Sequence, residues 1–279
     1  MPAHTLACFG LIGTIMVDDG TLEKAYAEAI ATQGVVTGTT AFARAMARVH
    51  RARGKSSIDV LRELFPGNEA RAQAAHLAFE RSLSGAVQRS GVQPVPGAGQ
   101  VLDELAESGV RVCVMSSFSH RQLSVFLTAL GWQDRVDLVL GADDVPRGCP
   151  APDLVLQAML TLGVDDVRDT IVVQSTDSGI QAGCRSGAGL VVAVLTGTHP
   201  AARLRRAGAT HVLASVADLP AVLAGGADPG LAASHVTAPR PAPEDSVPDQ
   251  PATADQAPDG QAPDVQPQQA VRQAGRARS

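Results

Sequence analysis

Residues 170–186 read TIVVQSTDSGIQAGCRS, an apolar run that is followed by a polar turn and then by an amphipathic stretch. The apolar run predicts a buried strand over Thr170–Val173, and the later residues predict a helix over Ser178–Ser186. The same strand-then-helix unit recurs from residue 91 onward. Such alternation predicts a doubly wound α/β domain, in which helices cover both faces of a parallel sheet.

Further strands and helices continue this pattern on both sides of the quoted stretch. The other strands are expected at Leu6–Phe9, Val110–Met115, Val136–Leu140, Leu190–Leu195 and His211–Leu213. The other helices are expected at Gly97–Ser108, His120–Leu130 and Asp153–Leu162, and a glycine follows each as a stop signal. Ligands of such domains bind beyond the carboxyl ends of the strands.

Residues 20–90 differ, because they contain no convincing strand and their apolar residues repeat at helical spacing. Four helices are expected, around Leu22–Ile30, Phe42–Val49, Ile58–Phe65 and Ala75–Val87. A helical block between the first and second strands has the position of a cap, with hinges near 17–20 and 93–97. We therefore predict an α/β core formed by 1–19 and 91–224 and a helical cap at 20–90.

Composition narrows the classes of function. The chain has 45% hydrophobic and 18% charged residues, enough apolar content for a buried core, and its net charge of -5 offers no basic face for nucleic acid. No apolar run is long enough to span a membrane, and the N-terminus does not resemble a signal peptide. Four cysteines without a C-x-x-C pair predict free thiols. These features favour a cytoplasmic protein that contacts neither nucleic acid nor membrane, and they leave its oligomeric state open.

Residues 225–279 have another composition, in which Pro, Ala, Asp and Gln replace the periodic apolar residues. A segment of this kind cannot bury enough apolar surface to offset the entropy of ordering it. We predict a disordered tail.

Four segments lie at the expected ligand edge of the sheet. They read FGLIGT (9–14), MSSF (115–118), RGCPAP (147–152) and VQSTDSG (173–179). Their order, spacing and flanking strands resemble the haloacid dehalogenase superfamily, and most of all its phosphonoacetaldehyde-hydrolase-like branch, along about residues 4–224. The resemblance implies a core of the doubly wound kind with an inserted helical cap, and Mg²⁺-dependent phosphoryl transfer to an aspartate.

Three of these segments depart from the family pattern at the residues that carry its chemistry. By the resemblance, Gly10 stands at the nucleophilic Asp, Cys149 at the basic residue and Ser175 at a metal-binding Asp. Glycine has no side chain with which to attack phosphorus, and Mg²⁺ requires carboxylate oxygens. In the cap, Ser57 stands at the family's Schiff-base lysine, and Lys55 is displaced from it. We predict no ordinary phosphohydrolase activity, no bound metal and no other cofactor.

Several polar residues of these segments are candidates for binding a small molecule, anions included. Ser116 matches the family's phosphate-binding Ser or Thr, although a Ser after a strand is also a common helix N-cap. Arg147 lies two residues from the basic position, and Asp177 is either a weak cation ligand or only a helix N-terminal acid. Further hydrogen bonds are expected from Thr14, Ser117 and Ser175.

Three functions therefore stay open. The leading one is a catalytically degenerate family member that binds a small ligand. The second is a repurposed enzyme of a biosynthetic pathway, with Cys149 as nucleophile if a base such as His120 lowers its pKa. The third is a partner-binding or regulatory protein that uses the cap and the tail. An acidic cluster at Asp18, Asp19 and Glu23 resembles diphosphate-binding sites of terpene cyclases, but hinge solvation and the helix dipole explain it.

Overall fold

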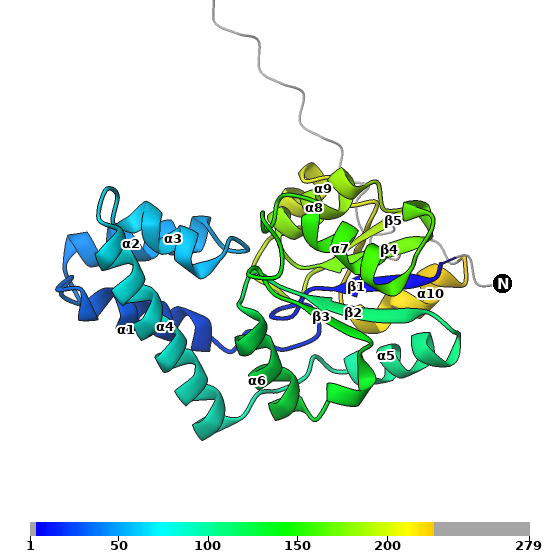
Figure 1. The fold of residues 1–279 in the computed structure, drawn as a ribbon, viewed down its shortest axis with the longest axis horizontal. Helices are drawn as coiled ribbons and strands as arrows, with labels where there is room; N and C mark the ends of the chain where they lie inside the picture. The colour runs from blue at the N-terminus through cyan, green and yellow to red at the C-terminus, as the bar shows by residue number, and fades with distance from the viewer. Residues whose placement is uncertain (1–3, 226–279) are drawn as a thin grey trace, which may run out of the picture. The chain divides into compact units, whose positions relative to one another are not determined.

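One parallel sheet organises the protein (Figure 1). The computed structural model describes residues 4–225, so that the predicted tail lies outside the described residues except for Gly225. The strands are β1 (Leu6–Phe9), β2 (Arg111–Met115), β3 (Leu138–Leu140), β4 (Thr170–Gln174), β5 (Leu190–Val194) and β6 (His211–Leu213). Their order across the sheet is β3-β2-β1-β4-β5-β6. The prediction of a doubly wound fold is confirmed, and the chain reverses its direction of winding between β1 and β4.

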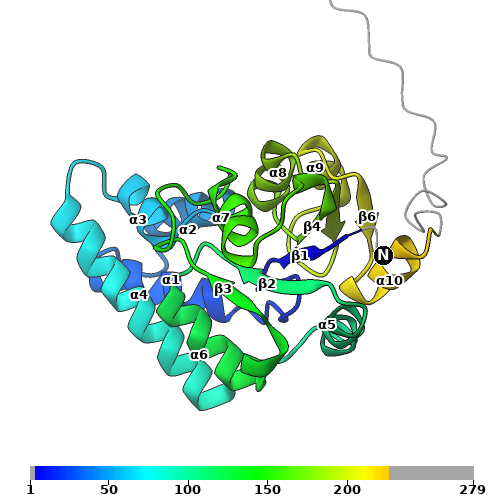
Figure 2. The same cartoon turned by 45° about the vertical axis from the view of Figure 1, so that its right-hand side comes forward.

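Helices cover both faces of the sheet, and alternate residues of β1 point to different layers. Ala7 and Phe9 belong to the larger hydrophobic cluster, together with residues of α5 (Ala98–Glu107), α6 (His120–Leu130) and α10 (Leu219–Leu223). Leu6 and Cys8 belong to a second cluster with α7 (Asp153–Leu162). On the same face as α7 lie α8 (Asp177–Ser186) and α9 (Ala201–Arg206) (Figure 2). Because both faces are covered, the strands are mainly apolar, and their polar residues lie at strand ends, as Arg111, Thr170, Gln174 and His211 do.

All predicted element boundaries agree with the structure within two residues, except those of the last insert helix. The third strand begins at Leu138 rather than Val136, because the Asp137 carboxylate accepts the Val112 N–H at 2.7 Å beside the start of the ladder. The last insert helix is longer than expected, since the Asn68 side chain caps it from outside the apolar run. The sequence analysis missed α9, α10 and three short 3₁₀ turns.

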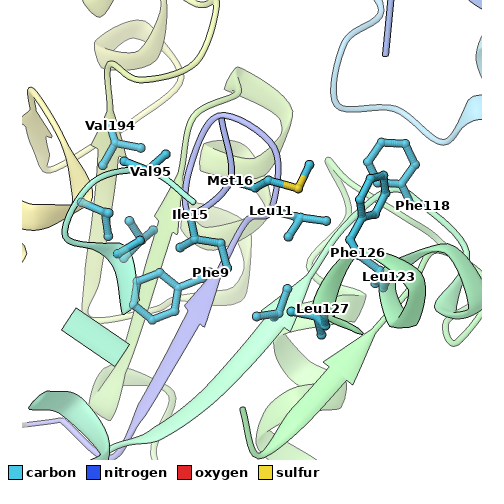
Figure 3. Close-up of a cluster of buried hydrophobic side chains, with 14 of the residues drawn as sticks. Phe9, Leu11, Ile15, Met16, Val95, Phe118, Leu123, Phe126, Leu127 and Val194 are labelled. Atoms are coloured by element: carbon cyan, nitrogen blue, oxygen red, sulfur yellow. The ribbon is translucent and has the colours of Figure 1, made fainter. Parts of the chain in front are cut away.

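Four helices form the insert between β1 and β2, as predicted. They are α1 (Thr21–Thr32), α2 (Thr40–Arg51), α3 (Ser57–Leu64) and α4 (Glu69–Ser90). A row of aromatic rings joins this insert to the core, because Phe79 of α4 lies between Tyr26 and Phe118, with ring centroids 4.4 and 6.5 Å away. Phe118 in turn packs on Phe126 of α6 at 5.6 Å (Figure 3). No helix in residues 4–225 is both long and apolar enough to cross a membrane.

The two segments that connect the insert to the core run antiparallel and are hydrogen-bonded to each other. The Val17 N–H donates to the Gln93 carbonyl, and the Val95 N–H donates to the Ile15 carbonyl, both at 2.9 Å. Ile15 and Val95 are buried beside Phe9 and Val194 (Figure 3). These hydrogen bonds join the two predicted hinge regions to each other beside the carboxyl end of β1.

Candidate functional site

A cavity of about 70 Å³ lies at the carboxyl edge of the sheet, where the core meets the insert. The four segments singled out in the sequence all contribute to it. Its wall also includes residues that follow β5 and residues from the insert. The lining includes Gly10, Asp18, Arg53, Gly54, Ser116, Ser117, Phe118, Cys149, Gln174, Ser175, Thr176, Gly179 and Thr198.

The side chain of Gln174 fills the space beside Gly10. A Cβ atom on Gly10 would lie only 3.0 Å from Gln174 Cδ and would overlap Gln174 Oε1. On the other side, a Cβ atom on Gly179 would lie 2.7 Å from the same Cδ. Gln174 is 7% exposed, and its amide has no hydrogen-bond partner among the described residues. Two glycines on neighbouring elements thus make room for one buried amide at the floor of the cavity.

The hydroxyl groups of Thr14 and Ser175 hold the loop after β1 against the end of β4. Thr14 Oγ1 donates to Ser175 Oγ at 3.2 Å, and Ser175 Oγ donates to the Ile12 carbonyl at 3.1 Å. Thr14 is fully buried and does not line the cavity, contrary to the expectation that it binds a ligand. Ser175 lines the cavity, but its one proton is used within the protein.

Ser116 and Ser117 bring hydroxyl groups to the cavity from the end of β2. Ser116 Oγ accepts the Phe118 N–H at 3.4 Å, and no acceptor within residues 4–225 takes its proton. The cap of α6 is Ser119, whose hydroxyl is part of a capping box with Gln122. Ser116 is therefore not occupied by capping and has a proton to donate into the cavity.

Cys149 and His120 are not joined by any contact in the described residues. Cys149 lines the cavity, where burial raises the pKa of its thiol to about 11. The exposed His120 ring lies outside the lining, with Nδ1 at 2.9 Å from Asp144 Oδ2. Since the thiolate is the nucleophilic form, a thiol with this pKa is not prepared for attack near neutral pH.

Two other predicted ligand residues point elsewhere. Arg147 forms a two-point ion pair with Asp153, and its side chain is 71% exposed, so it does not reach inward. Asp177 accepts from Arg203 Nε at 2.7 Å, and its backbone N–H donates to Nδ1 of the buried His199 at 3.0 Å. Burial, followed by the positive charge of Arg203, lowers the pKa of His199. The Asp177 carboxylate, at the start of α8, is thus bound by Arg203 and not directed to the cavity.

The insert closes one side of the cavity through Arg53 and Gly54. Arg53 Nη1 lies 2.5 Å from Asp18 Oδ2 and donates to Thr198 Oγ1 at 2.9 Å. Gly54 has a φ of +89°, and a Cβ atom there would overlap the Ser178 hydroxyl of the core. Sequence reasoning missed this contact, although the acidic Asp18 near a hinge and a glycine beside Arg53 were both visible.

The insert positions matched to the family's lysine lie away from this cavity. Ser57 Oγ is 3.1 Å from Nδ1 of His76 and lines a separate cavity of about 250 Å³. Lys55 is paired with Glu63 at the surface.

The residues at the cavity do not fit Mg²⁺. The one carboxylate among the lining residues is that of Asp18, which is bound by Arg53. Within residues 4–225, no group of three or more His, Cys, Asp or Glu side chains is arranged to hold a metal ion. A hard divalent cation prefers several oxygen ligands, and at least one free carboxylate is usual.

Comparisons with known proteins define the class. A model of the family "Haloacid dehalogenase-like hydrolase" matches residues 19–193. The chain belongs to this family, as the sequence predicted.

More specific similarity is to phosphonoacetaldehyde hydrolases. The enzyme of that name from Bordetella pertussis is 34% identical over 158 residues, which cover 47% of this chain and 56% of the relative. The one from Vibrio cholerae is 28% identical over 155 residues, with 47% and 57% covered. The chain thus spans little more than half the length of the curated relatives it matches.

Solved structures agree on the fold. A hydrolase from Pseudomonas syringae superimposes with a TM-score of 0.69 at 24% identity, covering 80% of this chain and 99% of that one. A phosphonoacetaldehyde hydrolase-like protein from Oleispira antarctica gives 0.69 at 24% identity, with 81% and 92% covered.

Proposed function

We propose that this haloacid dehalogenase-like protein does not transfer phosphoryl groups through an aspartate and instead binds a small molecule in the cavity. The observation that carries the proposal is the Gln174 side chain beside Gly10. By the family resemblance, the nucleophilic carboxylate belongs at residue 10. Here that position has no side chain, and a neighbouring amide occupies the space that a carboxylate would need.

The surrounding groups support the same conclusion. Removing a catalytic nucleophile costs on the order of 10⁶ in turnover in subtilisin. The thiol of Cys149 is neutral near pH 7 and cannot balance the charge of a phosphoryl transition state as a guanidinium would. Asp18 is held by Arg53 rather than directed to a metal. Three separate contributions to phosphoryl transfer are therefore missing from the cavity.

The test is a hydrolysis assay on the purified full chain with Mg²⁺. We expect p-nitrophenyl phosphate and phosphonoacetaldehyde to be hydrolysed no faster than in buffer containing heat-inactivated protein. A rate that rises in proportion to protein concentration and disappears when Mg²⁺ is chelated would contradict the proposal.

A further inference from the structure

The ionisable side chains that line the cavity carry no net charge. They are Asp18, Arg53 and Cys149. Asp18 and Arg53 neutralise each other at 2.5 Å, with only 9% and 12% of their side chains exposed. Burial keeps the Cys149 thiol protonated near pH 7. The cavity therefore offers a charged ligand no counter-ion that is not already paired.

Two further arginines near the cavity segments, Arg147 and Arg203, are paired elsewhere and do not change this balance. Arg147 is directed to solvent and to Asp153, and Arg203 binds Asp177. Moving an anion from water into an enclosed site without a partner for its charge costs several kcal/mol. An anionic ligand, which the sequence analysis had included, is therefore disfavoured by the surroundings.

The floor of the cavity has the opposite property, since it offers a polar group that lacks a partner. The Gln174 amide supplies two N–H donors and one carbonyl acceptor. The residue is 7% exposed and lies between two glycines, so its amide has little freedom to turn away. Its atoms are not among the fully shielded polar atoms of residues 4–225 that lack a partner, so the amide is accessible from the cavity to a ligand that supplies hydrogen bonds. The complement of an amide is a group that both donates and accepts.

The size of the cavity limits the rest of the ligand. A volume of about 70 Å³ is several times the roughly 10–15 Å³ that a single water molecule needs, but it is small for an organic ligand. The cavity therefore suits a small molecule. The Ser116 hydroxyl can donate one more hydrogen bond to such a molecule.

We propose that the cavity binds a small uncharged molecule with a carboxamide or urea group, which pairs with the side-chain amide of Gln174. This inference rests on the proposed function, in that the ligand is bound and not dephosphorylated. It adds the chemical class of the ligand and names Gln174 as the residue that selects it.

The experiment measures binding to the full chain by saturation-transfer NMR, with titration to obtain dissociation constants. The probes are acetamide and N-methylurea, compared with acetate, inorganic phosphate and methylphosphonate. Acetamide and acetate have nearly the same shape and differ in charge. We expect acetamide to bind at least about tenfold more tightly than acetate, which corresponds to about 1.4 kcal/mol.

Two variants connect the binding to the residue. Gln174→Leu keeps a side chain of similar size and removes the amide, and we expect it to weaken acetamide binding at least about tenfold. Gln100→Leu is the matched control, because Gln100 is exposed on α5 and bonds only Glu104. Thermal midpoints of both variants establish that they remain folded.

Each other result has a definite meaning. Tighter binding of phosphate or methylphosphonate than of the amides overturns this inference and leaves the proposed function standing. Absence of amide binding, or amide binding that Gln174→Leu does not weaken, overturns it as well. Mg²⁺-dependent hydrolysis in the earlier assay would instead remove the proposed function.

Discussion

Two parts of the cavity wall differ in how they relate to a phosphoryl-transfer site. We call the part of the wall at the carboxyl ends of β1 and β4 the β1–β4 edge. There, Gly10 and Gln174 leave no space for an attacking group. We call the part at the carboxyl end of β2 the β2 edge. There, Ser116 lines the cavity, and its hydroxyl oxygen accepts a hydrogen bond from the Phe118 N–H. At the β1–β4 edge, the filled edge, a glutamine side chain occupies the space beside Gly10, whereas the β2 edge carries the residue type that the family resemblance assigns to it.

This difference indicates that the residue sizes at the filled edge are matched to one another. A glycine at residue 10 alone would leave a void, and such voids are costly in protein interiors. Instead, a larger side chain at the end of the adjacent strand occupies the space, and a second glycine on α8 accommodates it. Both glycines therefore pack against the side-chain amide of Gln174.

The largest expected effect comes from rebuilding the filled edge. We combine Gly10→Asp, Cys149→Arg and Ser175→Asp with Gln174→Gly, which clears space for the new carboxylate. If the β2 edge is intact, Mg²⁺-dependent hydrolysis of p-nitrophenyl phosphate should rise at least about a hundredfold above background, well below the roughly 10⁶ that a nucleophile contributes in subtilisin.

The matched control for this rebuilding keeps Gln174 and makes only the other three changes. We expect it to remain inactive, because the glutamine amide still occupies the space of the carboxylate. Equal activity of the three-change and four-change proteins would show that Gln174 is no obstacle.

The β2 edge can be tested through the aromatic ring that supports it. Phe79 is fully buried between Tyr26 and Phe118, so Phe79→Ala should lower the free energy of unfolding by about 3–5 kcal/mol. Leu77→Ala is the control, since Leu77 is 56% exposed on the same helix and should change stability by less than about 0.5 kcal/mol. Urea denaturation measures both, and similar losses would argue against a packed connection between insert and core.

A smaller effect compares single methyl groups at the two edges. Gly10→Ala should destabilise by about 1–3 kcal/mol, because the new Cβ atom meets Gln174 and lies 2.9 Å from Thr14 Oγ1. Gly148→Ala, in the segment of Cys149, should be nearly neutral, since its Cβ atom would meet nothing nearer than Ala142 Cβ at 3.9 Å. Chemical denaturation of both variants tests this, and a neutral Gly10→Ala would mean that the space beside Gln174 is not full.

The smallest effect concerns pH and the start of α8. Burial lowers the pKa of His199 below its ordinary value of 6.5 in the folded protein. As pH falls through 6.5, the unfolded chain binds a proton that the folded protein does not, so the free energy of unfolding decreases. His199→Gln should make stability less dependent on pH between about 7 and 5, where unperturbed histidine titrates. An unchanged slope in denaturation experiments would exclude this role.

The fold was predictable because its evidence is local. Apolar runs such as 170–173 and the glycines after helices mark strands and helix ends without any knowledge of the tertiary structure. The four segments of the site were also found from their places after strands. The third strand was predicted too long, because the side-chain bond of Asp137 to the Val112 backbone is not local in sequence.

The side chains that line the cavity were less predictable, because they depend on contacts between residues that are far apart in the sequence. The sequence analysis named Ser175 and not Gln174. A glutamine at the end of an apolar strand, beside a strand that is followed by glycine, indicates that the larger side chain occupies the space next to the smaller residue. Arg147 and Asp177 were expected at the ligand, but Asp153 and Arg203 hold them. A role of residues 225–279 in binding a partner stays a prediction.

The most direct test of the account is a double-mutant cycle between Gly10→Ala and Gln174→Ala, measured as free energies of unfolding. If the glutamine side chain occupies the space beside Gly10, the cost of Gly10→Ala should fall by at least about 1 kcal/mol in the Gln174→Ala background. Part of the cost should remain, because the new Cβ atom also lies 2.9 Å from Oγ1 of the buried Thr14. Costs that add within about 0.5 kcal/mol would contradict the claim that one residue fills the place left by the other.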